Sequence, residues 1–371
     1  MAKKVTKRRL RKRVFIVLIP LVVFLSVLGY ATYLYVKADS VLSDSYESDG
    51  REKSELREEM VDPKYDNVSV LIMGVDENDH RKDDGPTRTD SLILATLNKD
   101  DKSVKMHSIP RDSYVYVPEV GYETKINHAH SHGGTQTTID TVENLLDIPV
   151  DYYVKLNFHA FVDVIDAIDG INVDVPYEFK ESDSMDKRDS IHLEKGQQTV
   201  NGEEALALAR TRKLDNDIER GKRQLDIIKS VIDKSVSVSS VLKFDNIIDA
   251  VGENMTTNMT FSEMKSFISY GTSGMDLDVQ SYTLEGEDYQ PSNIYYWQLD
   301  EVALQETRER LKKHLNIIDS STAESEAETD DGPVNESEGE EPVEEPVEEP
   351  IEEEETEEED TSLPDSYYDY E

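Results

Sequence analysis

Three short apolar runs in the first third of the chain carry charged residues at their ends. The runs are SVLIMGVD, TRTDSLILATLN and VKMHSIPRD; Asp76 closes the first, Asp90 stands at the start of the second and Arg111 follows the third. If consecutive strands pair as antiparallel neighbours, which is their commonest arrangement, all three side chains meet at one edge of a sheet. Two carboxylates and a guanidinium at one edge predict a site for a divalent cation and a phosphate group.

A second concentration of charge lies in the stretch ALARTRKLDNDIERGKRQ. Between Arg210 and Arg223 it has six basic and three acidic residues, in a chain that is acidic elsewhere. Arg210 and Arg212 follow the end of a predicted helix at alternate positions, which suits an extended segment. Arg220 and Gln224 share one face of the next helix because they are four residues apart. Arginine donates two parallel hydrogen bonds to phosphate, so the cluster predicts an anion pocket. The alternative is a surface helix whose arginines pair with their own acidic neighbours, Asp215, Asp217 and Glu219.

The elements that hold these residues follow an N-terminal segment of different character. The first 13 residues include eight basic and no acidic ones, and the 23 residues Val14 to Val36 carry no charge. At about 1.5 Å per residue, this helix is long enough to cross a hydrocarbon layer of roughly 30 Å. The basic flank predicts a cytoplasmic N-terminus and a domain outside the cell. A cleaved signal peptide is the alternative, but its apolar region is normally shorter.

The rest of the chain divides by composition. Residues 37–60 are polar without an apolar stripe, and the C-terminal region repeats Glu-Pro units that cannot form a core and should be disordered. The expected organisation is a basic cytoplasmic stub (1–13), a transmembrane helix (14–36), a stalk (37–60), a folded domain (61–318) and a disordered acidic tail (319–371).

Charge and cysteine content restrict the partners. Residues 321–371 hold 24 acidic and no basic residues and the stub holds eight basic ones, so the net charge of −40 leaves −24 on residues 37–320. This excludes general nucleic-acid binding, which needs a basic face. The chain has no cysteine, so an exported domain must rely on its core for stability.

Strand-like and helix-like stretches alternate in the folded domain. Residues 151–158 predict a strand, 159–169 an amphipathic helix and 171–175 a second strand, which together form a βαβ-like unit. Asn201 is a suitable N-cap for a further helix, and another starts near Asp217. The pattern predicts an α/β domain with α-β-α layers on a mixed central sheet.

In this order, the motifs resemble those of the LytR–CpsA–Psr family, membrane-anchored enzymes of Gram-positive cell walls. The resemblance rests on LIMGVD, TRTDSLILATLN, SIPRDSYV, KINHAHSHGG, NGEEALALARTR with DIERGKRQ, and SNIYYWQLD, over roughly residues 65–310. It implies a phosphotransferase that moves a glycopolymer, such as wall teichoic acid or a capsule chain, from a polyprenyl pyrophosphate carrier to peptidoglycan. The bond formed would be a phosphodiester, usually to the 6-hydroxyl of muramic acid.

The resemblance also implies roles for individual residues. Asp76 and Asp90 match the pair associated with Mg²⁺ or Mn²⁺, and Arg88 and Arg111 would act in catalysis. The pyrophosphate-binding set would consist of Arg88, Arg111, Arg210, Arg212, Arg220 and Gln224. We expect Lys125, in the motif KINHAHSHGG, to add another positive charge near the phosphates. Family members also have an apolar channel between sheet and helices for the prenyl tail, but the sequence does not identify its lining.

The chain lacks a G-x-S-x-G motif and a P-loop, so direct attack by the acceptor hydroxyl is simpler than a covalent enzyme intermediate. Asp217 could accept the hydroxyl proton; the alternative is that it only caps its helix. Two further activities are consistent with the same residues. One is a pyrophosphatase that hydrolyses the carrier, and the other is a non-catalytic protein that binds wall polymers.

Two stretches depart from the family pattern. The segment between Asp76 and Asp90 is longer and more polar than expected, and KINHAHSHGG carries His128, His130 and His132 where alanine and tyrosine are more frequent. On a strand the three histidines would share a face and could bind zinc. We expect them instead at a turn before a helix, solvated and without a metal.

Overall fold

The structure is a computed structural model that describes residues 12–75, 87–214, 216–235, 244–252, 254–272 and 277–317. Asp76, Asp215 and the acidic tail therefore lie outside the described residues. Helix α1 (Lys12–Asp44) contains the candidate membrane span Leu18–Asp44, which is long and apolar enough to cross a bilayer.

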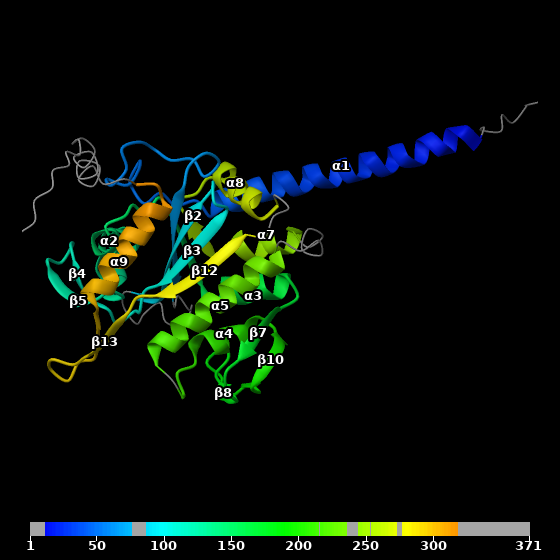
Figure 1. Ribbon diagram of the computed structural model, residues 1–371. Helices are drawn as coiled ribbons and strands as arrows, with labels where there is room; N and C mark the ends of the chain where they lie inside the picture. Colours follow the sequence, from blue (N-terminus) through cyan, green and yellow to red (C-terminus); the bar gives the residue numbers. More distant parts are fainter. Residues whose placement is uncertain are drawn as a thin grey trace, which may run out of the picture. The chain divides into compact units, whose positions relative to one another are not determined.

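The domain is built on a six-stranded sheet with the strand order β11-β6-β1-β2-β3-β12 (Figure 1). β1 pairs antiparallel with β2 and β2 with β3, whereas β6 runs parallel to β1 and β12 parallel to β3. The strands are β1 (Val68–Val75), β2 (Thr89–Asn98), β3 (Ser103–Ser108), β6 (Tyr152–Asn157), β11 (Met255–Thr257) and β12 (Asp278–Thr283). This confirms the antiparallel pairing of the three apolar runs and the mixed sheet.

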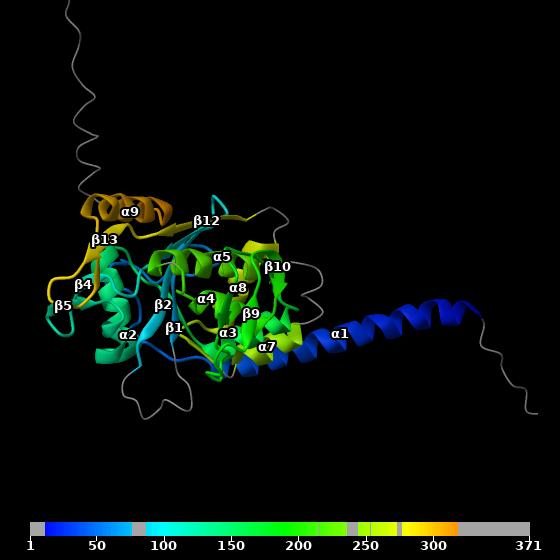
Figure 2. The same ribbon diagram turned by 90° about the horizontal axis from the view of Figure 1, so that it is seen from below.

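Helices cover both faces of the sheet (Figure 2), which confirms the predicted α-β-α layers. Side chains alternate between the faces along β1. Leu71 and Met73 pack in the core with α2 (His128–Leu146) and α9 (Glu301–His314). Val70 packs on the opposite side with Leu225 of α5 (Asp217–Ser235). The other helices are α3 (Phe158–Ala167), α4 (Gly202–Arg210), α7 (Phe244–Gly252) and α8 (Phe261–Thr272).

Four two-stranded sheets complete the described part of the domain. They are formed by β4 (Tyr114–Val117) with β5 (Tyr122–Lys125), β7 (Ile171–Val175) with β10 (Gly196–Val200), β8 (Phe179–Glu181) with β9 (Ile191–Leu193), and β13 (Gly286–Tyr289) with β14 (Tyr296–Leu299).

The predicted βαβ unit has the right elements but the wrong pairing. β7 follows α3 as expected, yet it pairs antiparallel with β10 and not with β6. Asp169 and Gly170 both have positive φ, and a Cβ on Gly170 would lie 2.5 Å from the main-chain oxygen of Val200. The tight left-handed turn therefore directs the chain out of the central sheet and into the separate two-stranded sheet of β7 and β10.

Residues 37–60, expected as a stalk, pack on the domain instead. Arg51 pairs with Glu143 at 3.1 Å, and Nη2 of Arg57 lies 2.7 Å from Oδ2 of Asp151, whose side chain is only 2% exposed. Asp151 also accepts a hydrogen bond from the main-chain nitrogen of Ser69 at 2.9 Å. The segment is held by buried ion pairs and not by an apolar face. The sequence prediction, which relied on apolar periodicity, therefore missed its packing on the domain.

His314 at the end of α9 forms a buried polar contact with the sheet. Its Nδ1 lies 2.8 Å from Oγ1 of Thr96 and its Nε2 2.8 Å from Oγ of Ser103. Burial lowers the pKa of His314 to about 4. The His314 imidazole binds a proton near pH 6.5 in the unfolded chain but only near pH 4 in the folded chain. The neutral, buried His314 therefore makes its full contribution to the free energy of unfolding above pH 6.5, and this contribution is lost as the pH falls towards 4.

We therefore expect the His314→Gln variant to lose less stability between pH 7 and pH 5 than the parent, by about 2 kcal/mol. Urea unfolding at the two pH values measures the difference. The matched control is His192→Gln, which removes an exposed histidine paired with Glu178. Equal losses in the parent and in His314→Gln would contradict the prediction.

Candidate active site

The first part of the site lies where β2 begins and β3 has just ended. Asp90 is the second residue of β2, and Arg111 follows the end of β3. Nη1 of Arg111 lies 2.6 Å from Oδ1 of Asp90. Oδ1 of the adjacent Asp112 lies 2.8 Å from Nζ of Lys125, at the end of β5. These four side chains form a connected charged row at one edge of the sheet.

Arg220 brings helix α5 to the same edge. Its Nη2 lies 2.8 Å from Oδ1 of Asp217 and donates a 3.4 Å hydrogen bond to the main-chain oxygen of Asp90. Nη1 of Arg212 lies 3.6 Å from the same Asp217 oxygen. Burial lowers the pKa of Arg220; Asp217 opposes this effect, and the positive charges of Arg111 and Arg212 add to it. Arginines from distant segments therefore share one electrostatic site.

Gln224 connects three elements behind these charges. Its Oε1 accepts a 2.9 Å hydrogen bond from Oγ of Ser91 in β2, and its Nε2 donates to the main-chain oxygen of Ala209 in α4 at 3.2 Å. Arg220 and Gln224 both contact the start of β2, which confirms that they share a helix face.

Arg210 and Arg88 lie at the margins of the charged group. The guanidinium of Arg210 sits 4.8 Å from the ring centroid of Phe158, and its Nη2 lies 3.8 Å from Asp186. Arg88 is exposed just before β2. Burial lowers the pKa of His128, and the positive charge of Arg88 acts in the same direction. Arg88 therefore lies close enough to the start of α2 for its charge to act on His128.

The structure thus places nine of the ten predicted site residues around one edge of the sheet, and Asp76 lies outside the described residues. Asp217 is the first residue of α5, but the main-chain nitrogen of Glu219 is bonded by Oδ1 of Asn216 at 3.0 Å. Asn216 is therefore the capping residue, and the proposed capping role of Asp217 is wrong. The carboxylate of Asp217 pairs with two arginines instead.

The three histidines lie at the start of α2, as expected, but not all are solvated. His130 is buried, and its Nδ1 lies 3.0 Å from the main-chain oxygen of Thr87. His128 Nδ1 lies 2.8 Å from Oγ1 of Thr124. Within the described ranges, no three His, Cys, Asp or Glu side chains are grouped to hold a metal. His130 therefore helps to fix the chain just before β2. The zinc alternative assumed that the three histidines share one face of a strand, whereas they lie at the start of a helix.

Several buried polar atoms at this edge lack a hydrogen-bond partner among the residues that the structure describes. They include the donors Oγ1 of Thr89, Nε of Arg111, Nη1 of Arg210, Oγ1 of Thr211 and Nε of Arg220, and one acceptor, Oδ1 of Asp217, which has ion pairs only. Each such atom costs about 1–3 kcal/mol when left unsatisfied. Three of them are guanidinium donors, so a ligand rich in negatively charged acceptor oxygens would satisfy them.

An apolar cavity of about 300 Å³ begins at this polar edge and runs between the sheet and helices α3, α4 and α5. Ser91, Asn157 and Gln224 mark its polar end. Its apolar wall includes Ile72, Ile93, Phe161, Ile165, Ile228 and Val231. The cavity is therefore suited to an apolar chain whose charged head remains beside the arginines.

Arg223 and Gly221 support the site and were not identified from the sequence. Arg223 is buried and donates through Nε to the main-chain oxygen of Leu208 at 3.1 Å and through Nη2 to that of Thr211, which fixes the chain between α4 and α5. A Cβ on Gly221 would lie 2.6 Å from Oγ of Ser108, so this glycine allows α5 to approach β3. The burial of Arg223 could not be predicted, because in the sequence it looks the same as the other charged residues at the start of α5.

An α-β-α domain with an arginine-lined polar edge at the end of an apolar cavity belongs to the class of proteins whose site suits an amphiphilic phosphorylated ligand. The model of the LytR_cpsA_psr family matches residues 32–313 of the chain. The chain therefore belongs to the LytR–CpsA–Psr family.

Its relatives include the polyisoprenyl-teichoic acid–peptidoglycan teichoic acid transferases TagT and TagU of Bacillus subtilis. TagT is 39% identical over 84% of this chain and 97% of its own length, and TagU is 40% identical over 83% and 98%. A solved structure of TagT bound to LIIa-WTA has a TM-score of 0.61 and 39% identity, and covers 71% of this chain and 97% of that one. A second, with bound octaprenyl pyrophosphate lipid, has a TM-score of 0.57 and 36% identity, and covers 72% and 97%.

Proposed function

We propose that the protein transfers an anionic glycopolymer of the teichoic acid type from a polyprenyl pyrophosphate carrier to peptidoglycan. The observation that carries the proposal is the convergence of Arg111, Arg212 and Arg220 on Asp90 and Asp217, directly beside the apolar cavity. The arginines would hold the diphosphate and the cavity the prenyl tail. The relatives named as teichoic acid transferases and the solved relative with a prenyl pyrophosphate lipid support this assignment.

The residues of the site divide the work of transfer. Phosphoryl transfer needs alignment and neutralisation of charge more than covalent chemistry. Arg220 and Arg212 would bind the diphosphate oxygens that leave with the lipid, and Arg111 those of the phosphate under attack. Asp217 holds both Arg212 and Arg220 in place, and as a carboxylate it can also take the proton of the attacking hydroxyl.

The site is also consistent with a divalent cation. Mg²⁺ is commonly held by one or two carboxylates together with phosphate oxygens and water. Asp90 is partly exposed and uses Oδ1 for Arg111, which leaves Oδ2 for Mg²⁺ or Mn²⁺. Asp76 would be the second ligand. The cation would supply positive charge to the diphosphate.

We expect Asp90→Asn to raise the Mg²⁺ concentration required for half-maximal transfer by about tenfold, because it removes one anionic ligand. A titration of transfer rate against Mg²⁺ measures this. Asp100→Asn, beyond the opposite end of β2, is the matched control. An unchanged Mg²⁺ requirement in Asp90→Asn would refute the metal role of this residue.

Helix α1 would anchor the protein in the cell membrane as a single-pass helix, with the N-terminus in the cytoplasm and the domain outside. The basic residues before the apolar span favour this orientation. The lipid-linked donor and the peptidoglycan acceptor would then both be accessible to the domain. Protease digestion of intact protoplasts tests the orientation, because only an external domain would be cleaved.

The function is tested by incubating the full chain in vesicles with Mg²⁺, a polyprenyl pyrophosphate saccharide and peptidoglycan fragments. Mass analysis of the products should show a saccharide linked to the fragment by a phosphodiester. Free saccharide phosphate in place of the conjugate would support the pyrophosphatase alternative. Donor binding without any product would support the non-catalytic alternative.

A further inference from the structure

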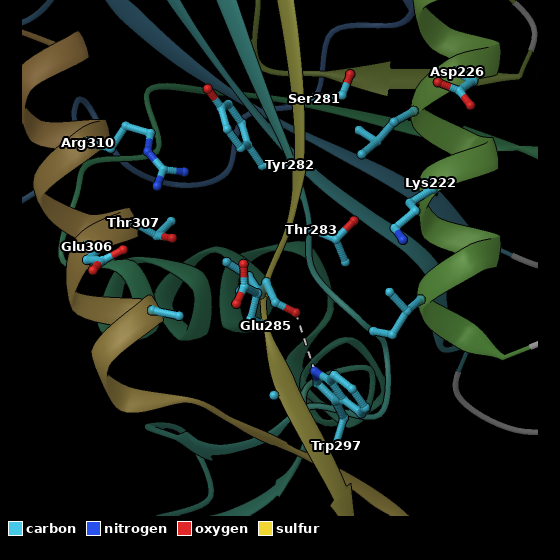
Figure 3. A pocket seen from close by; sticks show the side chains of 15 residues that line it. Lys222, Asp226, Ser281, Tyr282, Thr283, Glu285, Trp297, Glu306, Thr307 and Arg310 are labelled. Atoms are coloured by element: carbon cyan, nitrogen blue, oxygen red, sulfur yellow. Dashed lines mark hydrogen bonds between the residues drawn. The ribbon is translucent and has the colours of Figure 1, made fainter.

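A second and larger cavity lies outside the site described above. It is a groove of about 700 Å³ between α5 and α9, with the edge strand β12 as its floor (Figure 3). Trp297 closes one end, where its Nε1 donates a 3.4 Å hydrogen bond to the main-chain oxygen of Leu284. Polar and apolar side chains line the groove together, which distinguishes it from the apolar cavity of the candidate active site.

On the floor of the groove, some main-chain groups of β12 have no partner strand among the residues that the structure describes. β12 is the last strand of the sheet, and it bonds β3 through alternate residues. The nitrogens of Asp278 and Leu284 donate to β3 and its flanking turn, so the residues of even number face the sheet. Ser281 and Thr283 therefore direct their N–H and C=O groups away from β3. Such an edge is a template for an additional extended peptide.

The two walls carry side chains of both charges (Figure 3). α5 contributes Lys222 and Asp226 and α9 contributes Glu306 and Arg310, each pair four residues apart and thus on one helix face. The guanidinium of Arg310 lies 4.6 Å from the ring centroid of Tyr282. Opposite charges on each wall favour an extended ligand that itself carries both amino and carboxylate groups.

The groove shares helix α5 with the candidate active site. Ile218 and Lys222 line the groove, whereas Asp217 and Arg220 on another face of the same helix turn bind at the diphosphate edge. The main-chain nitrogen of Trp297 also donates a 2.8 Å hydrogen bond to the oxygen of Asp112, next to Arg111. One end of the groove therefore adjoins the segment that carries Arg111 and Asp112.

We propose that this groove binds the stem peptide of the peptidoglycan acceptor as an added strand on β12. The inference rests on the proposed function, in which the acceptor hydroxyl belongs to the sugar that bears this peptide. The outward main-chain groups of Ser281 and Thr283 pair with the peptide. Asp226 and Glu306 face its amino group, and Lys222 and Arg310 face its carboxylates. Docking the peptide brings the sugar to the diphosphate edge.

Binding can be measured without any transfer, because Trp297 is the only tryptophan of the chain. Titration of the full-length protein in detergent with a soluble disaccharide-peptide should change its tryptophan fluorescence with saturation. The same disaccharide without peptide should bind at least about tenfold more weakly, since it lacks the strand contacts. Equal affinities for the two ligands, or no binding of either, would overturn the proposal. Neither result bears on donor binding or on hydrolysis.

The strand contact is tested by Ser281→Pro. Proline removes an N–H that faces away from β3, so the sheet keeps its own hydrogen bonds. We expect about five- to tenfold weaker binding of the disaccharide-peptide and an unchanged affinity for the peptide-free disaccharide. The control Ser281→Ala keeps the N–H and should bind as the parent does. Equal effects of the two substitutions would overturn the strand model.

A second variant keeps the test decisive if Ser281→Pro does not fold. Asp226→Asn combined with Glu306→Gln should weaken binding of a peptide with a free amino group about tenfold, because two anionic partners are removed. The same peptide with an acetylated amine should bind the parent and the variant equally. Weakening of both ligands, or of neither, would contradict the assigned contacts. An unrelated extended peptide of the same charge that binds equally well would also overturn the assignment to the stem peptide.

Discussion

Replacing Arg220 by methionine is expected to lower the rate of glycopolymer transfer about a hundred- to a thousandfold, the usual cost of removing one well-placed donor to a transition state. Arg220 is buried and is bonded to Asp217 and to the main chain of Asp90, and within the described part of the chain its Nε has no hydrogen-bond partner. Its positive charge is therefore fixed at the site, and its Nε can donate a hydrogen bond to a phosphate oxygen. Steady-state rates at saturating donor measure the effect.

Stability separates this role from a structural one. A buried arginine replaced by methionine of similar length often leaves stability unchanged or higher, because the desolvation of the charge no longer opposes folding. Asp217 keeps Arg212 as a partner at 3.6 Å. We expect a thermal midpoint at or above that of the parent, together with the loss of transfer.

The matched control is Lys229→Met, which removes one exposed positive charge from the same helix. It should transfer at the parent rate, because Lys229 is about 13 Å along the helix axis from Arg220 at about 1.5 Å per residue. A similar loss in both variants would mean that the rate depends on the net charge of α5. A normal rate in Arg220→Met would remove this arginine from the site.

The charged edge could be predicted from the sequence because it depends on the pairing of strands that are neighbours in the chain. Three consecutive strands with short connections leave few alternatives for pairing, so Asp90 and Arg111 had to approach each other, and they lie 2.6 Å apart. The spacing of Arg220 and Gln224 likewise determined their shared face. The chain could not show that Arg220 is buried, since the cluster around it has the polar pattern of a surface helix.

The apolar cavity and the packing of residues 37–60 depend on contacts between distant segments. Ile93, Phe161 and Val231 line one cavity from three elements, and each fits the apolar pattern of an ordinary core residue. Arg57 and Asp151 are 94 residues apart, and a charged side chain gives no sign in the sequence of its partner. Periodicity identifies elements, but it does not identify which core positions are left unfilled.

Filling the far end of the apolar cavity should make transfer depend on the length of the donor lipid. Val231 lines the cavity seven residues beyond Gln224, or about 10 Å along α5. In Val231→Trp the indole would occupy the space of the distal isoprene units. We expect about a hundredfold lower kcat/KM for a long polyprenyl donor, because several apolar groups, each worth about 0.8 kcal/mol per CH₂, stay in water.

A donor with about two isoprene units should fit between Gln224 and residue 231 and react normally with Val231→Trp. Lys229→Trp is the control, because it places the same indole on the exposed side of the same helix turn. It should accept long and short donors as the parent does. If Val231→Trp used both donors at the parent rate, the tail would have to bind elsewhere. If Val231→Trp lost activity equally with long and short donors, the substitution would have disturbed the arginine site through α5. Only a prenyl tail inside the cavity makes the loss depend on donor length, so an equal loss would contradict the prediction.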